Sequence, residues 1–167
     1  MSDERPTGDL PATADAVVAD LVNWSYSLGK EPVVVRREIP GFVANRLQYA
    51  LIREAYWLVE QNVCTTEDVD RVLRHGLGLR WASMGPFESV DFAGLDVHLK
   101  VAGTLFPLLS CSEDAPSALQ TAVASGALGV KSGRGLRGTY EPDAVSRRRA
   151  DQARTLAALE QLVRGDS

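Results

Sequence analysis

The sequence predicts a mainly α-helical protein that is preceded by one helix and one strand of an α/β unit. Two observations lead to this prediction. From Gly41 onward, almost every segment carries apolar residues at the spacing of a helix. Before that point, the segment "EPVVVRRE" contains a run of valines, which is typical of a strand buried on both faces of a parallel sheet. A chain of 167 residues is expected to hold one modest domain with an appended fragment.

The N-terminal part is expected to contain a leader, a helix and the strand. Residues 1–12 are polar and acidic, so we expect a disordered leader that is neither a signal peptide nor a transit peptide. A helix is predicted next, because apolar residues recur at helical spacing between Thr13, which can cap it, and Gly29, which can end it. With the strand, residues 13–38 form a residual helix-strand unit.

Residues 39–167 are predicted to form a helical domain. The segment "FVANRLQYALIREAYWLVEQNV" is apolar on nearly every face and predicts a central helix that is buried from several sides. Thr65 and Asp68 form a capping box for a helix that ends at Gly76. The following "GLGLRWASMGP" is expected to be a turn-rich connector, and Pro86 suits the first turn of the next helix.

The remaining helices are predicted at about residues 96–109, 117–125 and 143–163, the last of them amphipathic and rich in arginine. A glycine-rich loop, "GALGVKSGRGLRG", separates the last two.

A single strand creates a physical problem, because its backbone N–H and C=O groups stay unpaired. Residues 13–38 therefore have the character of the last helix and strand of a larger α/β unit. Another chain supplies the rest of that sheet, or two copies pair their strands, or the strand interpretation is wrong.

Composition and charge exclude several classes of protein. The net charge of −4 argues against nucleic acid as the main partner, and no window is apolar and long enough to span a membrane. Cys64 and Cys111 match no metal spacing and are expected to be reduced thiols of a cytoplasmic protein. Only His75 and His98 could supply imidazole, so no structural metal is expected.

The glycine loop contains a literal G-x-G-x-x-G from Gly133 to Gly138. That pattern holds a dinucleotide only when it follows a strand and opens a helix within a βαβ unit. Here a helix of small residues precedes it, so we reject a nucleotide site and predict a structural loop. Lys131, Arg134 and Arg137 either meet an anionic group or are solvated at the surface.

Two polar residues stand out as candidates for binding. Asn45 shares a helix face with Tyr49, and its amide either closes the helix start or donates to a substrate oxygen. Arg80 either holds a carboxylate or phosphate by paired hydrogen bonds or binds the carbonyls at a helix end. His98 is interpreted as a surface or packing residue, and no Ser-His-Asp or Cys-His arrangement is present.

Two segments, "PGFVANRLQYALIREAYWLVE" and "CTTEDVDRVLRHGLGLRWASMGPFE", resemble the C-terminal domain of the 3-hydroxyacyl-CoA dehydrogenase family. The "GLGLRW" run and the Arg-rich last helix are most similar to the branch of L-gulonate 3-dehydrogenase and lambda-crystallin. The resemblance extends from about Leu28 to the C-terminus. The loop "GVKSGRG" is similar to the family's Gly-x-Lys-Ser/Thr-Gly-x-Gly signature, whereas "LRGTY" departs from the usual Phe-Tyr-x-Tyr.

The resemblance implies a helical dimerisation domain of the type found in 6-phosphogluconate and 3-hydroxyacyl-CoA dehydrogenases. This domain closes over a substrate that lies against a Rossmann domain. Residues 13–38 then resemble the last helix and strand of that Rossmann domain, which would explain the unpaired strand.

The resemblance also implies a site. Asn45 matches the family's motif asparagine, which contacts the substrate beside a His–Glu pair, and Arg80 matches an arginine that anchors an anionic substrate group. The His–Glu pair and the nucleotide-binding glycines belong to the Rossmann domain, and neither His75 nor His98 occupies the catalytic position. The predicted substrate-binding residues are Asn45, Arg46, Tyr49, Arg80, Trp81 and Lys131, with Asn45 also assigned to catalysis.

Three functional hypotheses follow. The first is a split NAD-dependent 3-hydroxyacyl or 3-hydroxy acid dehydrogenase, in which this chain binds an acyl-CoA, acyl-carrier or hydroxy-acid substrate and dimerises. A separate Rossmann chain then brings NAD, since this chain alone is expected to bind no cofactor. The second is a free-standing homodimeric non-redox enzyme of a biosynthetic pathway, such as a cyclase, dehydratase or hydrolase. The third is a non-catalytic scaffold or binding module.

Overall fold

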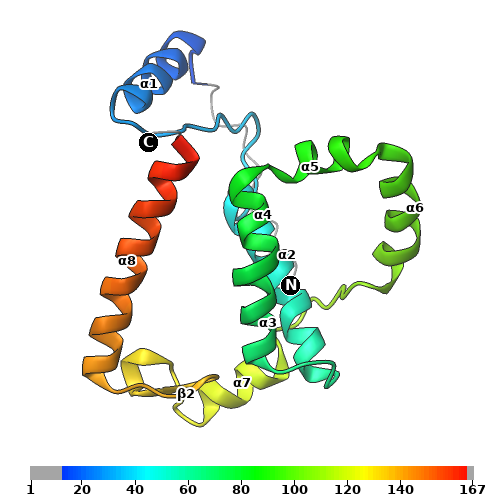
Figure 1. Cartoon of the computed structure of the whole chain (residues 1–167), viewed down its shortest axis with the longest axis vertical. Coiled ribbons are helices and arrows are strands. Elements are labelled where there is room, and N and C mark those ends of the chain that lie inside the picture. Colours follow the sequence, from blue (N-terminus) through cyan, green and yellow to red (C-terminus); the bar gives the residue numbers. More distant parts are fainter. Residues whose placement is uncertain (1–12, 165–167) are drawn as a thin grey trace, which may run out of the picture. The chain divides into compact units, whose positions relative to one another are not determined.

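The computed structural model describes residues 13–164. The chain divides into two compact units, Met1–Arg46 and Leu47–Ser167, and each is described by itself. The leader predicted at residues 1–12 lies outside the described residues. The prediction of a mainly helical chain is confirmed, because the elements of the described residues are helices apart from one two-stranded hairpin (Figure 1).

The first unit begins with helix α1, Asp15–Ser27, and the predicted stop at Gly29 is confirmed. Gly29 has a φ of +66°, the left-handed conformation that glycine adopts without strain. The N–H of Lys30 donates to the carbonyl oxygen of Ser25 at 3.0 Å, as in a Schellman motif. The predicted cap is wrong: no side chain caps the start of α1, so Thr13 does not have this role.

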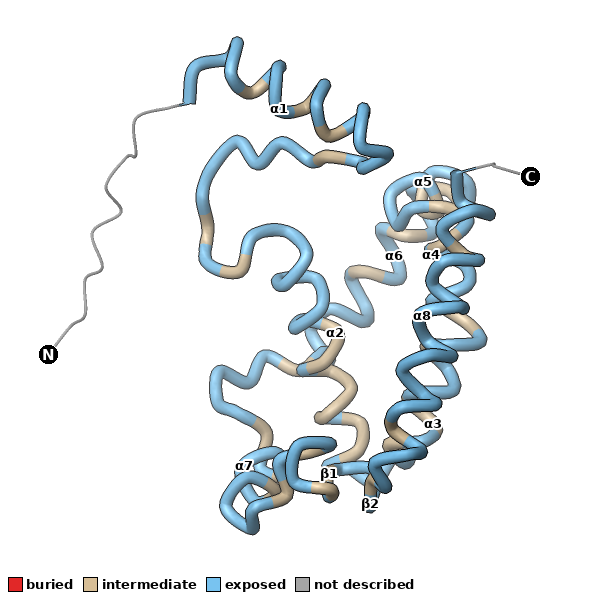
Figure 2. The backbone as a smooth tube through the Cα atoms, turned by 90° about the vertical axis from the view of Figure 1, so that its left-hand side faces the viewer, coloured by how far each residue is buried: buried red, intermediate tan, exposed pale blue. Residues whose placement is uncertain are grey.

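The strand predicted within residues 31–38 is not formed. These residues have no regular hydrogen-bonded structure, and Val33 is 76% exposed. A strand needs a neighbour to pair with, and no other strand of the described residues pairs with this segment. The valine run is therefore exposed to solvent in this chain (Figure 2).

Helix α2, Phe42–Glu60, starts at a tight turn. The N–H of Phe42 donates to the carbonyl oxygen of Ile39 at 3.0 Å, across Pro40 and Gly41. The φ of Gly41 is +82°, so Pro and Gly occupy the positions that a type II turn requires. The predicted break at Pro40-Gly41 is confirmed.

The prediction that this central helix is buried from several sides is wrong. No side chain among residues 13–164 is fully buried, and Tyr49 of α2 is 66% exposed. From Leu51 to Val59 the residues are half-buried, apart from Arg53 and Trp57, which are exposed. The apolar faces of the helix have no complete second layer to pack against within the described residues.

The capping box predicted for helix α3, Thr66–Val72, is confirmed. The N–H of Asp68 donates to Oγ1 of Thr65 at 3.2 Å, and the N–H of Thr65 donates to Oδ2 of Asp68 at 3.3 Å. Two N–H groups that an open helix end would leave unpaired are thereby satisfied.

The predicted helix end at Gly76 and the predicted connector are both wrong. A π-helical turn, Leu73–Leu77, follows α3 directly, and helix α4, Gly78–Ser83, follows the π-turn. The segment from Thr66 to Ser83 is therefore one helical rod with one widened turn. The two glycines that suggested a connector lie inside this rod.

The remaining helices lie close to their predicted positions. They are α5, Pro86–Ala93, with Pro86 in the first turn; α6, Leu95–Leu105; a 3₁₀ turn, Phe106–Leu108; α7, Ser117–Ala124; and α8, Pro142–Arg164. No helix within the described part of the chain is both long and apolar enough to cross a bilayer. Cys64 and Cys111 are free thiols.

Two carboxylates of α2 hold the segment that leads into α7. Glu54 accepts a hydrogen bond from the N–H of Ser110 at 2.8 Å. Glu60 accepts from Oγ of Ser117 at 2.7 Å and from the N–H of Ala118 at 3.2 Å. These hydrogen bonds, that from the Ser117 hydroxyl first, lower the pKa of the Glu60 carboxyl. The end of α2 thus serves as the cap that α7 lacks, and the two lie together in Figure 1.

The glycine loop forms a small hairpin. A 3₁₀ turn, Val130–Ser132, leads into β1, Arg134–Gly135, which pairs antiparallel with β2, Gly138–Thr139. The prediction of a turn-rich structural loop is confirmed, although the hairpin itself was not predicted.

Replacement of Thr65 by alanine should lower the free energy of unfolding by about 1 kcal/mol, because it removes the acceptor that caps α3. Chemical denaturation monitored by circular dichroism measures this change. Thr104→Ala is the matched control, since the Thr104 hydroxyl only donates back to the carbonyl oxygen of Lys100 within α6. Equal effects of the two substitutions would contradict the capping role.

Candidate functional site

The six predicted substrate-binding residues lie at three places along the described chain. Asn45, Arg46 and Tyr49 lie in the first turns of α2, Arg80 and Trp81 lie on α4, and Lys131 lies in the 3₁₀ turn before the hairpin. Among residues 13–164, no hydrogen bond or ion pair joins any two of the six. Their assignment to one site stays a prediction.

At the start of α2, the Asn45 and Arg46 side chains begin close to the backbone of Gly41. A Cβ placed on Gly41 would lie 3.4 Å from Cγ of Arg46 and 3.6 Å from Cβ of Asn45. Both side chains are exposed, and the Asn45 amide makes no hydrogen bond within the described residues. The interpretation that this amide closes the helix start is therefore not supported, and the amide is available to a ligand.

Further along α2, one face carries tyrosines. Burial raises the pKa of the Tyr56 hydroxyl, and the charges of Glu60 and Tyr49 raise it further. Tyr49 and Tyr56 are seven residues apart and therefore lie on one face of α2.

On α4, the Arg80 guanidinium makes no hydrogen bond or ion pair within residues 13–164. Its backbone carbonyl accepts a hydrogen bond from Oγ of Ser83 at 2.8 Å. The guanidinium donates to no carbonyl at a helix end among the described residues. The alternative in which Arg80 binds such carbonyls is therefore not observed. The neighbouring Trp81 is 44% exposed and offers part of its indole to solvent.

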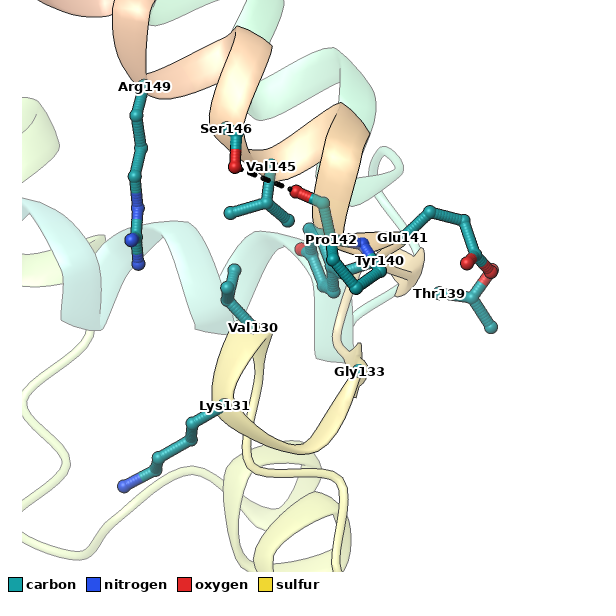
Figure 3. Close-up of a pocket in the computed structure, with 10 residues that line it drawn as sticks. All are labelled: Val130, Lys131, Gly133, Thr139, Tyr140, Glu141, Pro142, Val145, Ser146 and Arg149. Carbon is teal, nitrogen blue, oxygen red and sulfur yellow. Dashed lines mark hydrogen bonds between the residues drawn. The ribbon is translucent and has the colours of Figure 1, made fainter.

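Lys131 lines a surface pocket of about 600 Å³ between the glycine loop and the start of α8 (Figure 3). Lys131 and Arg149 extend on one side of this pocket, and Glu141 lies on the other. The Ser146 hydroxyl is already committed, since it donates to the carbonyl oxygen of Pro142 at 3.1 Å. The full lining is Val130, Lys131, Gly133, Thr139, Tyr140, Glu141, Pro142, Val145, Ser146 and Arg149.

Of these lining residues, sequence reasoning identified only Lys131. Arg149 and Tyr140 carry no local motif. Tyr140 directly follows β2, and Arg149 lies near the start of α8, which leads away from the hairpin (Figure 1). No polar side chain of the pocket is fully buried. The pocket can attract an anion but holds none of its polar groups in a fixed, desolvated position.

The glycine loop does not fit NAD. A Cβ on Gly135 would lie 2.9 Å from Cα of Gly129. The missing side chain of Gly135 therefore makes room for the backbone at Gly129 and not for a ligand. The N–H of Gly129 donates to the carbonyl oxygen of Arg134 at 2.8 Å, and the N–H of Tyr140 donates to that of Gly133 at 2.8 Å. A dinucleotide site instead needs such N–H groups directed at a pyrophosphate.

Arg137, one of the basic residues of this loop, binds α3. Its Nε lies 2.6 Å from Oε1 of Glu67, and its guanidinium also pairs with Asp70. The anionic group that Arg137 meets is thus part of the chain. Arg134 likewise donates to the carbonyl oxygen of Ser125 at 2.8 Å. No group of three potential metal ligands occurs among the described residues.

Comparison with known proteins assigns this arrangement to a family. Residues 41–138 match the family model of the 3-hydroxyacyl-CoA dehydrogenase C-terminal domain. The chain is 40% identical over 154 residues to 5-formyl-3-hydroxy-2-methylpyridine 4-carboxylate 5-dehydrogenase of Mesorhizobium japonicum, covering 92% of this chain and 49% of that protein. It is 50% identical over 74 residues to L-carnitine dehydrogenase of the same organism, covering 44% of this chain and 20% of that protein.

A solved structure agrees with these relatives. The crystal structure of a 5-formyl-3-hydroxy-2-methylpyridine 4-carboxylic acid 5-dehydrogenase, described as an NAD⁺-dependent dismutase, superimposes with a TM-score of 0.87 at 37% identity. The match covers 92% of this chain and 49% of that one. The chain therefore spans about half the length of this relative.

Arg137→Gln should destabilise the chain at neutral pH but not in acid. The Glu67 pKa is lowered by hydrogen bonds from its own backbone N–H and from Thr66, and then by the charge of Arg137. A lowered pKa in the folded state means that the unfolded state binds more protons, so this stabilisation exists at neutral pH and disappears as pH falls below about 4. Urea unfolding at both pH values measures the difference.

The loss for Arg137→Gln should be smaller than that for Thr65→Ala, because the ion pairs are exposed. Arg147→Gln on α8 is the control, since Arg147 has no ion pair within the described residues. An equal loss at both pH values would show that the effect does not come from the carboxylates.

Proposed function

The chain belongs to the 3-hydroxyacyl-CoA dehydrogenase family through the C-terminal domain of that family, and from this we propose that it is the substrate-binding and dimerisation part of an NAD-dependent 3-hydroxyacyl or 3-hydroxy acid dehydrogenase. In this proposal a Rossmann domain supplies the nucleotide site and the general base. In the split arrangement that we propose, the Rossmann domain is a separate chain.

The observation that carries the proposal is a pair of uncommitted polar side chains at the positions where the family binds substrate. The Asn45 amide and the Arg80 guanidinium have no partner within residues 13–164, whereas Arg137 and Arg134 do. A polar group that a fold does not use is available for a ligand, and charged groups make the stronger hydrogen bonds.

The proposed roles follow from the chemistry of each group. The Asn45 amide donates to a substrate oxygen, and the planar Arg80 guanidinium holds a carboxylate by two parallel hydrogen bonds. Tyr49 and Trp81 present exposed aromatic faces for the carbon chain of the substrate. Arg46 and Lys131 add positive charge for an anionic substrate or a CoA phosphate.

A carboxylate substrate is in keeping with the relative from Mesorhizobium, whose name specifies a 4-carboxylate. Redox chemistry belongs to the Rossmann domain in this proposal, because the glycine loop of this chain does not fit NAD. The residues described here bind, orient and enclose the substrate.

Dimerisation is proposed from the apolar surface of α5 and α6. Leu95 and Leu99 lie one turn apart on α6 and are 63% and 76% exposed. Phe87 and Phe92 of α5 and Phe106 of the 3₁₀ turn are also exposed. Apolar side chains in such number mark an interaction surface, and we assign it to a second copy of this chain.

Co-expression with a Rossmann-domain protein of the same family should give NAD-dependent oxidation of 3-hydroxy acids or 3-hydroxyacyl-CoA, measured as NADH formation. Arg80→Ala in the complex should lower kcat/KM for a carboxylate substrate by about tenfold or more, because a charge-assisted pair is lost. Arg147→Ala is the control. If instead the purified chain converts a substrate without nicotinamide, and Asn45→Ala abolishes that conversion, the non-redox alternative replaces this proposal.

The double variant Leu95→Gln, Leu99→Gln should raise the dimer Kd by about 100-fold or more, since each buried leucine contributes about 2 kcal/mol. Sedimentation equilibrium measures the change. Lys100→Gln on the same helix is the control. A dimer that is unaffected by the double variant would place the interface elsewhere.

A further inference from the structure

The π-turn at Leu73–Leu77 interrupts the helical rod that carries Arg80. The N–H of Gly78 donates to the carbonyl oxygen of Leu73, five residues earlier, whereas an α-helical bond reaches back only four. Such turns are rare and occur mostly as single turns, frequently at functional sites. A π-turn adds one residue to the helix, so every side chain beyond it is rotated by about 100°.

The π-turn depends on one of the two glycines near it. A Cβ on Gly78 would lie 2.7 Å from the carbonyl oxygen of Leu73, which is too close for any side chain. A Cβ on Gly76, within the same turn, would meet nothing within 4 Å. Gly78 is therefore required by the close approach of Leu73, and Gly76 is not.

The extra residue decides which side chain continues the half-buried face of the rod. Val69 and Leu73, both half-buried, lie about three and two turns before Arg80 in a continuous α-helix. Without the π-turn, Arg80 would lie on their face. With one residue added, Trp81 takes that position in the rotation of the helix, with 44% of the residue still exposed, and Arg80 turns to the side of Val72, which is 61% exposed.

We propose that Gly78 is a positioning residue, which admits the π-turn and thereby turns the Arg80 guanidinium off the Val69–Leu73 face and places the Trp81 indole on that face. This inference rests on the proposed function, in which Arg80 binds an anionic group of the substrate. The π-turn then explains why the Arg80 guanidinium faces solvent without a partner among the described residues, and why the Trp81 indole lies next to it.

The first test follows Trp81 directly and needs no substrate. In a Trp24→Phe, Trp57→Phe background of the full chain, Trp81 is the only tryptophan. Gly78→Ala should convert the π-turn to an α-turn and rotate Trp81 toward solvent, which increases quenching of its fluorescence by acrylamide. Gly76→Ala should leave the quenching unchanged. Equal quenching in the two variants overturns the proposal.

The second test is a rescue. Deletion of Gly76 from the Gly78→Ala variant removes the extra residue, so a continuous α-helix returns Arg80 and Trp81 to their original directions. Native quenching in this double variant supports the proposal, including the case in which Gly78→Ala alone does not fold. A double variant that does not recover native quenching overturns the proposal, because Gly78 then matters only for stability.

The third readout uses the complex with the Rossmann domain and 3-hydroxybutyrate, a simple 3-hydroxy acid with a carboxylate. Gly78→Ala should raise KM about tenfold with little change in kcat, as expected when binding of a remote charge is lost. Deletion of Gly76 should restore KM, and Gly78→Ala should add nothing to Arg80→Gln. If no complex oxidises any substrate, the proposed function fails, while the quenching experiments still decide the role of Gly78.

Discussion

The constraint on which the rest of this structure depends is that its apolar side chains have no complete cover. No residue between 13 and 164 is fully buried, and Figure 2 accordingly shows only exposed and half-buried segments. Burial of apolar surface is the dominant favourable contribution to folding, at about 25 cal/mol per Å². The helices of this chain must therefore be defined by local hydrogen bonds. Their apolar faces are left to pack against a further layer of protein. A second copy and a Rossmann domain are the proposed sources of that layer.

The local hydrogen bonds explain how much of the fold could be predicted from sequence. The capping box of Thr65 and Asp68, the left-handed stop at Gly29 and the first-turn proline at Pro86 each involve residues within a few positions of one another. Such devices are determined by the nearest neighbours in the sequence, and all three were predicted correctly. The strand expected at residues 31–38 is not formed in the single chain, because a strand is defined by its partner and the valine run says nothing of where that partner lies.

The helical rod from Thr66 to Ser83 shows a different limit. Two glycines in "GLGLRW" favour a turn by composition, and a widened helical turn has no composition of its own. The sequence signal that could have predicted the π-turn is the rotational position of the apolar residues around the helix. Trp81 continues the face of Val69 and Leu73 only if one residue is added between them, and a helix that needs an extra residue to keep its apolar face contains a π-turn. For the candidate site, the motif residues were identifiable, but the ion pairs of Arg137 with Glu67 and Asp70 were not, since they join segments that are distant in the sequence.

The arginines of this chain differ in whether the described residues supply them with a partner. Arg71 and Arg154 pair with carboxylates three residues away on their own helices, and Arg137 joins the hairpin to α3 through Glu67 and Asp70. Each of these cations has a partner that the fold supplies. Arg80 lies on the same rod as the carboxylates that bind Arg137, yet the π-turn presents it where the described residues offer no carboxylate. Arg147 also has no ion pair within residues 13–164, so the feature that distinguishes Arg80 is the π-turn before it, a rare geometry that costs a helix its regular bonding and occurs frequently at functional sites.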